Sequence, residues 1–191
     1  EQYDSFFLIT NDTELSRAQT LAPMNKLFKE HQRVGILSPC SMRWGERLLL
    51  QETTIKYFWF IHNSALLLRR NFIESIMEIE KPNYFNFLFD GSNFRGYFSE
   101  SELIAKAYAN NWAAAITTKV SAEENESYLL NKADLIRTES YDENIKLYIE
   151  EGQNWLRRKY GFNSRWSMQQ YVKSFYDRFF DFYPEYKKFK V

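Results

Sequence analysis

Cysteine, glycine and proline are scarce in this chain of 191 residues, and each scarcity excludes a class of protein. Cys40 is the only cysteine, which excludes an internal disulfide and a cysteine-rich zinc site. Six glycines and four prolines are too few for a low-complexity chain. No apolar run is long enough to span a bilayer, and the first residues lack the pattern of a secretory signal. We therefore expect a cytoplasmic protein without a transmembrane segment.

An excess of charge of one sign is also absent, because 25 basic residues balance 25 acidic ones. A neutral chain gives no support for binding nucleic acid through its phosphates, so we expect no nucleic-acid partner. What the chain does have is apolar and aromatic material: 45% of its residues are hydrophobic and 18% are aromatic. That is enough for one domain with a substantial core built from long regular elements.

Strand-like and helix-like segments alternate in the first part of the chain, and helices follow. Short apolar runs predict strands at 6–9, 33–37, 56–61, 64–68 and 113–120. Helical spacing and capping residues predict helices over 14–30, from Asn71 with Glu74 in the reciprocal capping position, and from Ser99. Two long helical segments follow near 143–159 and 166–183. This order predicts an α/β core over residues 1–122 with a helical C-terminal extension over 123–191, packed together as a single domain.

From residue 61 onward a series of short motifs appears in a specific order. Residues 63–70, Asn-Ser-Ala-Leu-Leu-Leu-Arg-Arg, combine a turn, an apolar strand and an arginine pair. Phe89-Asp90 comes next, then residues 99–103 (Ser-Glu-Ser-Glu-Leu) at a helix start and residues 110–112 (Asn-Asn-Trp) at its end. This order resembles the acceptor-side half of family 2 glycosyltransferases of the GT-A fold. Upstream, residues 7–13 and 34–39 are similar to the metal-binding strand of that family and the strand after it, so the likeness covers residues 4–112.

The resemblance implies a mixed, mainly parallel sheet of a truncated GT-A type. It also implies inverting transfer of a sugar from a nucleoside-diphosphate sugar to a saccharide hydroxyl. The chain departs from the family pattern, because Glu100 stands where the family has an aspartate and residues 120–123 lack its histidine ligand. The first half of the family's nucleotide-binding region has no counterpart, which fits either a fragment of a longer enzyme or a naturally reduced transferase. A non-catalytic saccharide-binding or oligomerisation domain that has lost donor binding is the competing functional interpretation.

Asp12 follows the first predicted strand, where α/β sheets place ligand chemistry. The resemblance implies that Asp12 binds Mg²⁺ or Mn²⁺ at the donor diphosphate, with Asn11 assisting at the donor. The structural alternative is that Asp12 caps the helix predicted over 14–30, since aspartate caps helices well. Both interpretations stay open at the level of sequence.

Glu100 is the candidate general base, which takes the proton from the acceptor hydroxyl as that hydroxyl attacks the sugar. Its position at a helix start favours the ionised form through the helix dipole. The alternative is a first-turn acid without a chemical role. Glu102 is a candidate acceptor-binding residue, although Ser99 and Glu102 also fit a capping box.

Asp90, Arg69 and Arg70 complete the candidate donor- and acceptor-binding residues. Asp90 either orients an acceptor hydroxyl or caps the turn at Gly91. The two arginines either meet phosphate or form surface ion pairs with nearby acids.

Several aromatic and histidine residues favour structural roles. His62 lies between two apolar runs, where a hydrogen-bonded turn residue is expected rather than a metal ligand. Trp44 and Trp59 offer rings for stacking on a sugar, but packing is the expected role. The aromatic residues spaced four apart in 171–183 are expected to face the core or an oligomer interface.

In the GT-A fold, the missing elements lie beside the strand at 6–9. We therefore expect this strand to form a sheet edge with exposed apolar side chains. Such an edge is expected to pair with a second copy of the chain or to be covered by the aromatic C-terminal helices, so a homo-oligomer is predicted.

Overall fold

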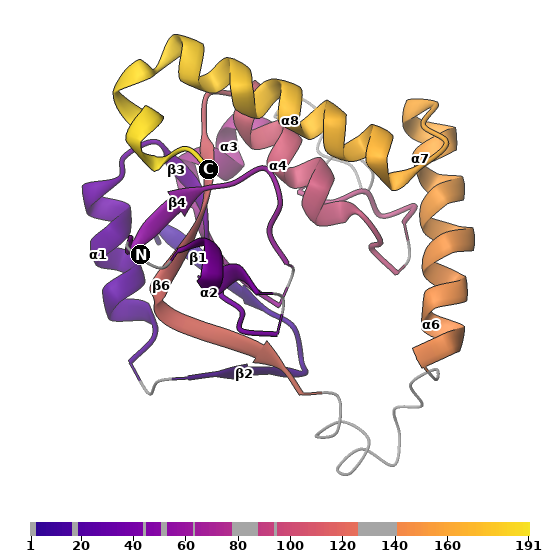
Figure 1. Cartoon of the computed structure of the whole chain (residues 1–191), viewed down its shortest axis with the longest axis horizontal. Coiled ribbons are helices and arrows are strands. Elements are labelled where there is room, and N and C mark those ends of the chain that lie inside the picture. Colours follow the sequence, from indigo (N-terminus) through magenta and orange to yellow (C-terminus); the bar gives the residue numbers. More distant parts are fainter. Residues whose placement is uncertain are drawn as a thin grey trace.

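A mixed sheet organises the N-terminal part of the chain (Figure 1). The computed structural model describes residues 3–16, 19–43, 45–50, 53–62, 64–77, 88–93, 95–125 and 141–191. In these residues the strands are β1 (Ser5–Ile9), β2 (Thr13–Leu15), β3 (Val34–Cys40), β4 (Ile55–Tyr57), β5 (Ala65–Arg69) and β6 (Ala113–Glu124). Their order is β1-β5-β3-β6-β2, and β4 also pairs with β6.

The expected mainly parallel sheet is wrong, because β3–β6 is the one parallel pairing among the described strands. β5 runs antiparallel to both of its neighbours, β1 and β3, and β4 runs antiparallel to β6. β2 is also antiparallel to β6, because the chain reverses in the short turn between β1 and β2. Since β5 lies between them, β1 and β3 run in the same direction, as does β6. The carboxyl ends of β1, β3 and β6 therefore meet at one edge of the sheet.

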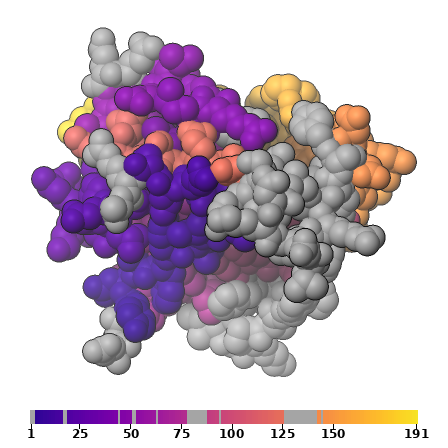
Figure 2. Space-filling model, turned by 90° about the horizontal axis from the view of Figure 1, so that it is seen from below, coloured from indigo at the N-terminus to yellow at the C-terminus, as the bar shows by residue number. Residues whose placement is uncertain are grey.

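Residues 5–15 supply both ends of the strand order, β1 at one end and β2 at the other. β1 pairs with β5, whereas β2 pairs with the end of β6, Thr13 opposite Glu124 and Leu15 opposite Ala122. Because a short turn joins β1 to β2, this segment brings the sheet close to a barrel. Figure 2 shows the N-terminal part of the chain, in indigo, at the surface across the middle of one face.

The predicted position of the first strand at a sheet edge is confirmed. Its side chains stay partly exposed, with Phe6 38%, Leu8 38% and Ile9 48% accessible. The prediction that the aromatic C-terminal helices cover this strand is wrong, because those helices pack against other elements. Pairing with a second copy stays a prediction.

The helices of the described residues are α1 (Leu21–Glu30), α2 (Glu46–Leu49), α3 (Arg70–Ile76), α4 (Ser99–Ala109), α6 (Tyr141–Leu147), the π-helical turn η1 (Tyr148–Gly152), α7 (Gln153–Tyr160), α8 (Arg165–Phe182) and the 3₁₀ turn η2 (Pro184–Phe189). In Figure 1, α1 lies beside the sheet, α8 lies across the top of the molecule, and α7 and α6 stand on the side away from α1. None of the described helices is both long and apolar enough to cross a lipid bilayer.

Two predicted helix starts are wrong. The helix expected from residue 14 begins at Leu21, because Glu14 belongs to β2, whose residues pair with β6. Asn71 does not cap a helix: α3 already begins at Arg70, and Glu74 forms an ion pair with Arg70 at 3.6 Å. In both places tertiary contacts outweigh the local capping preference.

α4 is the helix predicted from Ser99, and it contributes to the core. Leu103, Ile104, Ala107 and Tyr108 of α4 are buried. α8 crosses this helix (Figure 1) and buries Val172, Tyr176, Phe179 and Phe180. Of the aromatic residues spaced four apart, Phe179 is buried, and Tyr171, Phe175 and Tyr183 are partly buried against the core, so the core interpretation is confirmed in part. β6 runs to Glu124, beyond the expected boundary at residue 122, and α8 of the extension packs on α4.

Candidate functional site

Asp12 lies at the edge where the carboxyl ends of β1, β3 and β6 meet. It is half-buried in the turn between β1 and β2, and its backbone oxygen accepts a hydrogen bond from the amide of Asn125 at 2.7 Å. The turn is further fixed by Thr10 and Thr13, whose hydroxyls are 2.7 Å apart. Since β2 follows directly, the interpretation of Asp12 as a helix cap is wrong. Asn11, in the same turn, is exposed.

The described residues contain no group of three or more His, Cys, Asp or Glu side chains arranged to hold a metal ion. A Mg²⁺ ion in a phosphate-transfer site often takes only one or two protein carboxylates, and substrate phosphates and water supply its other ligands. Asp12 fits that limited role, as a single hard oxygen donor in an accessible turn.

Glu100 is the second residue of α4 and is half-buried. Its Oε1 accepts a hydrogen bond from the Ser101 hydroxyl at 3.3 Å. Burial raises the pKa of Glu100 to about 7, and the hydrogen bonds from its own backbone amide and from Ser101 offset only part of this effect. The expectation that the helix dipole keeps Glu100 ionised is therefore wrong: burial dominates, and the carboxyl titrates near neutral pH.

Asp90 and Glu102 lie in one buried ion cluster with Lys159 of α7. The Lys159 ammonium lies 2.7 Å from Asp90 Oδ2 and 2.6 Å from Glu102 Oε1. Trp155 also donates to Asp90 Oδ2 at 3.1 Å, and Tyr160 donates to Glu102 Oε1. Asp90 is 7% exposed and Glu102 is 2% exposed. The cluster joins the loop before α4, α4 itself and α7.

Hydrogen bonds control the protonation of Asp90. Burial alone would raise the pKa of this carboxyl, but the hydrogen bonds from Lys159, Ser92 and Trp155 lower it well below the usual range. The amide of Ser92 donates to Asp90 Oδ1 at 2.9 Å, which confirms that Asp90 caps the turn at Gly91. Among the described residues, both carboxylate oxygens of Asp90 are thus occupied by protein donors.

The capping box predicted for Ser99 and Glu102 is wrong. Phe98 precedes α4 in the left-handed conformation, with φ of 65°, and provides no side-chain cap. Glu102 instead points into the ion cluster, because Lys159 provides a stronger partner than a backbone amide. Its Oε2 is buried, has no hydrogen-bond partner in the part of the chain that the structure describes, and lies 3.8 Å from the ammonium of Lys106.

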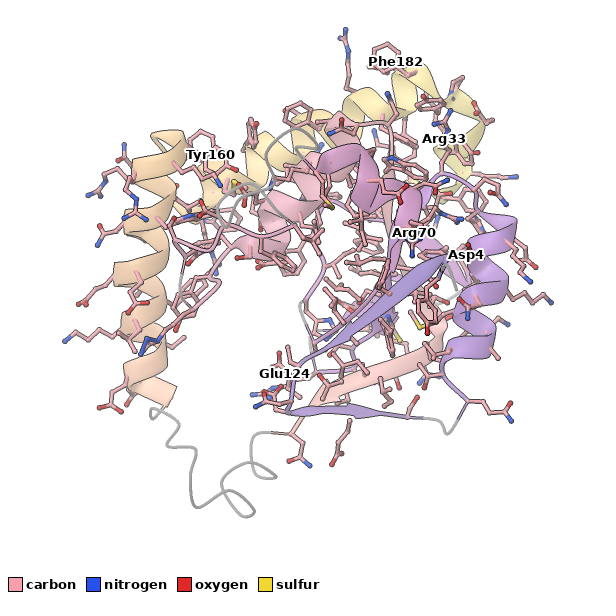
Figure 3. All side chains as sticks on the ribbon, turned by 180° about the vertical axis from the view of Figure 1, so that it is seen from behind. Asp4, Arg33, Arg70, Glu124, Tyr160 and Phe182 are labelled. Carbon is pink, nitrogen blue, oxygen red and sulfur yellow. The ribbon has the colours of Figure 1, made fainter. Side chains whose placement is uncertain are left out.

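The two arginines bond to the protein's own carbonyl groups. Arg69 donates to the carbonyls of Val34 at 2.9 Å and Phe28 at 2.6 Å, and its guanidinium lies over the Phe28 ring. Arg70 donates to the carbonyl of Tyr3 and forms an ion pair with Glu74. This ion pair with a nearby acid is the alternative to phosphate binding that the sequence left open. Figure 3 shows Arg70 beside Asp4, whose carbonyl accepts from the Arg70 amide at 2.9 Å. Both arginines therefore fix the ends of β1, β3 and β5.

A buried polar network lies at the same edge as Asp12, and sequence reasoning found only its histidine. His62 Nδ1 lies 3.1 Å from Glu46 Oε1, and His62 Nε2 bonds to the Ser64 hydroxyl. The order acid, imidazole, hydroxyl is that of hydrolytic triads. Ser64 is 0% exposed, however, so no substrate reaches its oxygen. The network fixes the loop before β5, which confirms the structural interpretation of His62.

Glu123 of β6 completes this edge. Its carboxylate accepts hydrogen bonds from the amides of Met42 at 2.5 Å and Arg43 at 3.3 Å, and from the Ser41 hydroxyl at 3.0 Å. The loop after β3 thereby holds a carboxylate in a ring of donors, as anion-binding backbone turns do. Glu123 was not among the sequence candidates.

The two acids that carry the transferase hypothesis have separate surroundings. Asp12 contacts the end of β6, whereas Glu100 contacts Ser101 of its own helix. Among the described residues, no hydrogen bond or ion pair joins Asp12 to Glu100. Trp59 packs against Tyr176 with ring centroids 5.1 Å apart, the predicted packing role. Trp44, Asn63 and Phe94 lie outside the described residues.

Comparison of the chain with protein-family models, with curated protein sequences and with solved structures found no match in any of the three. The likeness to family 2 glycosyltransferases therefore rests on the residues of this chain.

Proposed function

We propose that this chain is a glycosyltransferase-like domain that transfers a sugar, with inversion, from a nucleoside-diphosphate sugar to a saccharide hydroxyl. The observation that carries the proposal is the state of Glu100. A general base works best when its pKa lies near the working pH. A half-buried carboxyl with a pKa of about 7, at the start of a helix in the motif of the resemblance, meets that condition.

Glu100 accepts the proton of the acceptor hydroxyl while the oxygen forms a bond to the anomeric carbon of the sugar. The bond from that carbon to the diphosphate breaks on the opposite face, and the nucleoside diphosphate leaves with the electron pair. Asp12 would hold a divalent cation, Mg²⁺ or Mn²⁺, which would supply positive charge at the leaving diphosphate. Asn11 assists at the donor.

Asp90, Glu102, Arg69 and Arg70 act indirectly in this proposal. Asp90 and Glu102 fix α4, and with it Glu100, through Lys159. The arginines fix β1 and β3 at the ends away from the Asp12 turn, since Arg69 bonds to Val34 at the start of β3 and Arg70 bonds to Tyr3 just before β1. We place the activity in the cytoplasm, since the single cysteine is a buried free thiol.

Binding of the donor nucleotide tests this proposal. UDP and GDP are titrated separately in the presence of Mn²⁺, and the melting temperature is recorded. At about 100 times the Kd, binding stabilises the native state by about 2.7 kcal/mol. In a domain of this size that raises the melting temperature by roughly 5–10 °C.

Two matched variants identify the site. Asp12→Asn is expected to abolish the metal-dependent shift, whereas Asp4→Asn, an exposed acid before β1, is expected to retain it. No shift with either nucleotide, or an equal shift in Asp12→Asn, would reject Asp12 as the metal ligand.

A non-catalytic saccharide-binding or oligomerisation domain is the second candidate. It is favoured by the engagement of Asp90, Glu102, Arg69 and Arg70 with protein partners and by the lack of a three-ligand metal group among the described residues. This function predicts no response to nucleotide and Mn²⁺. The same titration therefore separates the two candidates.

A further inference from the structure

The carboxyl of Glu100 lies next to the helical C-terminal extension. Glu100 begins α4, and the preceding Tyr97 and Phe98 pack against Tyr148 of the π-helical turn η1, with ring centroids 5.2 Å and 4.8 Å apart. The charge of Glu100 acts directly on Tyr148, where it adds to burial in raising the pKa of the phenol. Residues far apart in the chain thus enclose the start of α4.

The π-helical geometry of η1 allows this close approach. A π turn is rare and inserts one extra residue into a helix, which re-aims the side chains around it. Gly152 ends the turn with ordinary right-handed helical dihedral angles, which any residue can adopt, so the backbone conformation does not require glycine here. Glycine is needed for space: a Cβ at Gly152 would lie 2.7 Å from Phe98 Cε2 and 3.0 Å from Tyr97 Cβ. η1 therefore sits directly on the two residues that lead into α4.

α8 reaches the same carboxyl through a hydrogen-bond relay. The side-chain amide of Gln169 donates to the Ser101 hydroxyl at 3.4 Å, and that hydroxyl donates to Glu100 Oε1 at 3.3 Å. Ser101 is 2% exposed, so few other partners compete for its hydroxyl. With its oxygen accepting from Gln169, the Ser101 hydroxyl is oriented to donate to Glu100.

We propose that the C-terminal extension completes the base site, with Tyr148 of η1 shielding the Glu100 carboxyl from water and Gln169 of α8 orienting it through Ser101. Tyr148 and Gln169 are positioning residues. Their role in sugar transfer rests on the proposed function, whereas their effect on the Glu100 carboxyl does not.

Several charged groups on the packed elements act on other partners. Arg165 of α8 acts on Tyr148 and lowers the pKa of that phenol. Glu151 of η1 pairs with Arg95 at 3.4 Å, and Glu102 of α4 pairs with Lys159. In the proposal, Tyr148 excludes water from Glu100, which raises the pKa of the carboxyl. Gln169 orients the Ser101 hydroxyl as a donor to Glu100, which lowers that pKa.

The experiment is a ¹³C NMR titration of the glutamate carboxyls in the full chain, with the Glu100 signal assigned by its loss in Glu100→Gln. Tyr148→Ala admits water, so the midpoint for Glu100 is expected to fall by at least about one pH unit. Tyr148→Phe keeps the ring and is expected to leave the midpoint near that of the wild type. Gln169→Ala frees the Ser101 hydroxyl to turn away, so the midpoint is expected to rise.

Ile149→Ala is the matched control, because Ile149 lies on the same turn and is 47% exposed. It is expected to leave the midpoint unchanged. An unchanged midpoint in both Tyr148→Ala and Gln169→Ala would overturn the proposal, and if Tyr148→Ala does not fold, Gln169→Ala decides alone. Shifted midpoints in a protein that transfers no sugar would support the positioning role and reject the transferase.

Discussion

Removal of the Lys159 ammonium should expose how much the buried ion cluster contributes to stability. Lys159→Met keeps most of the side chain's length and helix propensity but removes the charge. Among the described residues, Asp90 at 7% exposure is then left without an ammonium partner, and Glu102 at 2% exposure keeps only Lys106, 3.8 Å away. Trp155 and Tyr160 remain as neutral donors to the two acids.

The cost follows from the burial of the two acids. Removing one partner of a buried ion pair costs about 3–5 kcal/mol, because an uncompensated charge stays in the interior. The Lys159 side chain is 31% exposed, so water compensates part of its loss. We therefore expect a loss of about 3 kcal/mol, at the low end of that range.

The effect should depend on pH in a defined direction. The pKa of Asp90 is lowered in the folded protein, so its contribution is complete above the ordinary aspartate range and is lost as pH falls through the folded pKa. The pKa of Lys159 is raised, so its contribution is complete below the ordinary lysine range and is lost as pH rises through the folded pKa. The difference between wild type and Lys159→Met is therefore largest between these limits.

Urea unfolding followed by circular dichroism at pH 7 and at pH 3 measures this difference. Arg158→Met is the matched control on the same helix, since Arg158 is exposed and makes no hydrogen bond or ion pair among the described residues. A Lys159→Met variant as stable as Arg158→Met at pH 7 would refute the reasoning. Glu102→Gln combined with Lys159→Met should recover part of the loss, because one buried charge is removed with its partner.

Two further stability predictions follow from close contacts. Gly152→Ala is expected to destabilise the protein by about 1–2 kcal/mol in urea unfolding, because overpacking against Phe98 outweighs the better helix propensity of alanine. If Gly152→Ala is as stable as the wild type, η1 can shift away from Phe98 without a cost in stability. Tyr176→Phe removes a hydroxyl that donates to the carbonyls of Tyr57 and Val191 and accepts from the Val191 amide at 2.8 Å. The free energy of unfolding, measured by thermal unfolding, is expected to fall by about 1–3 kcal/mol, and amide hydrogen exchange at Val191 is expected to become faster. Unchanged exchange at Val191 would show that other contacts hold this residue.

α4 and α8 were predictable because their helical periodicity and their tertiary environment agree. Residues 103, 104, 107 and 108 repeat at helical spacing, and the structure buries all four. The aromatic stripe of α8 faces the core in part, with Phe179 buried and Tyr171 and Phe175 partly buried. Where a continuous apolar face meets a continuous apolar partner, the pattern in sequence is sufficient.

The ion cluster was not predictable, because it joins residues whose local sequence indicates other roles. Glu102 fits a capping box by spacing, and Asp90 fits a turn, but Lys159 comes from a helix far along the chain. The same holds for Glu46 and Ser64 around His62. No local signal marks these contacts, since they arise only when strands and helices pack.

The sheet was predictable in part. The edge position of β1 was foreseen, whereas the inserted antiparallel β5 was not. Alternating strands and helices favour parallel pairing, but the partners of β4 and β5 lie far away in the chain, and no local signal gives their direction. The site residues Asp12 and Glu100 were chosen by motif order. Their surroundings, including Tyr148 and Gln169, required the folded chain.

The most direct test of the central claim is sugar transfer by Glu100→Gln. Release of nucleoside diphosphate is measured at pH 7 from UDP-glucose and GDP-mannose with Mn²⁺. Alkyl glycosides of glucose, galactose and N-acetylglucosamine serve as acceptors. Glu74→Gln, an exposed glutamate on α3, is the matched control. If Glu100 is the base, Glu100→Gln loses transfer by at least about 10²-fold with an unchanged unfolding midpoint, while Glu74→Gln keeps full activity. Equal turnover in wild type and Glu100→Gln would contradict the account.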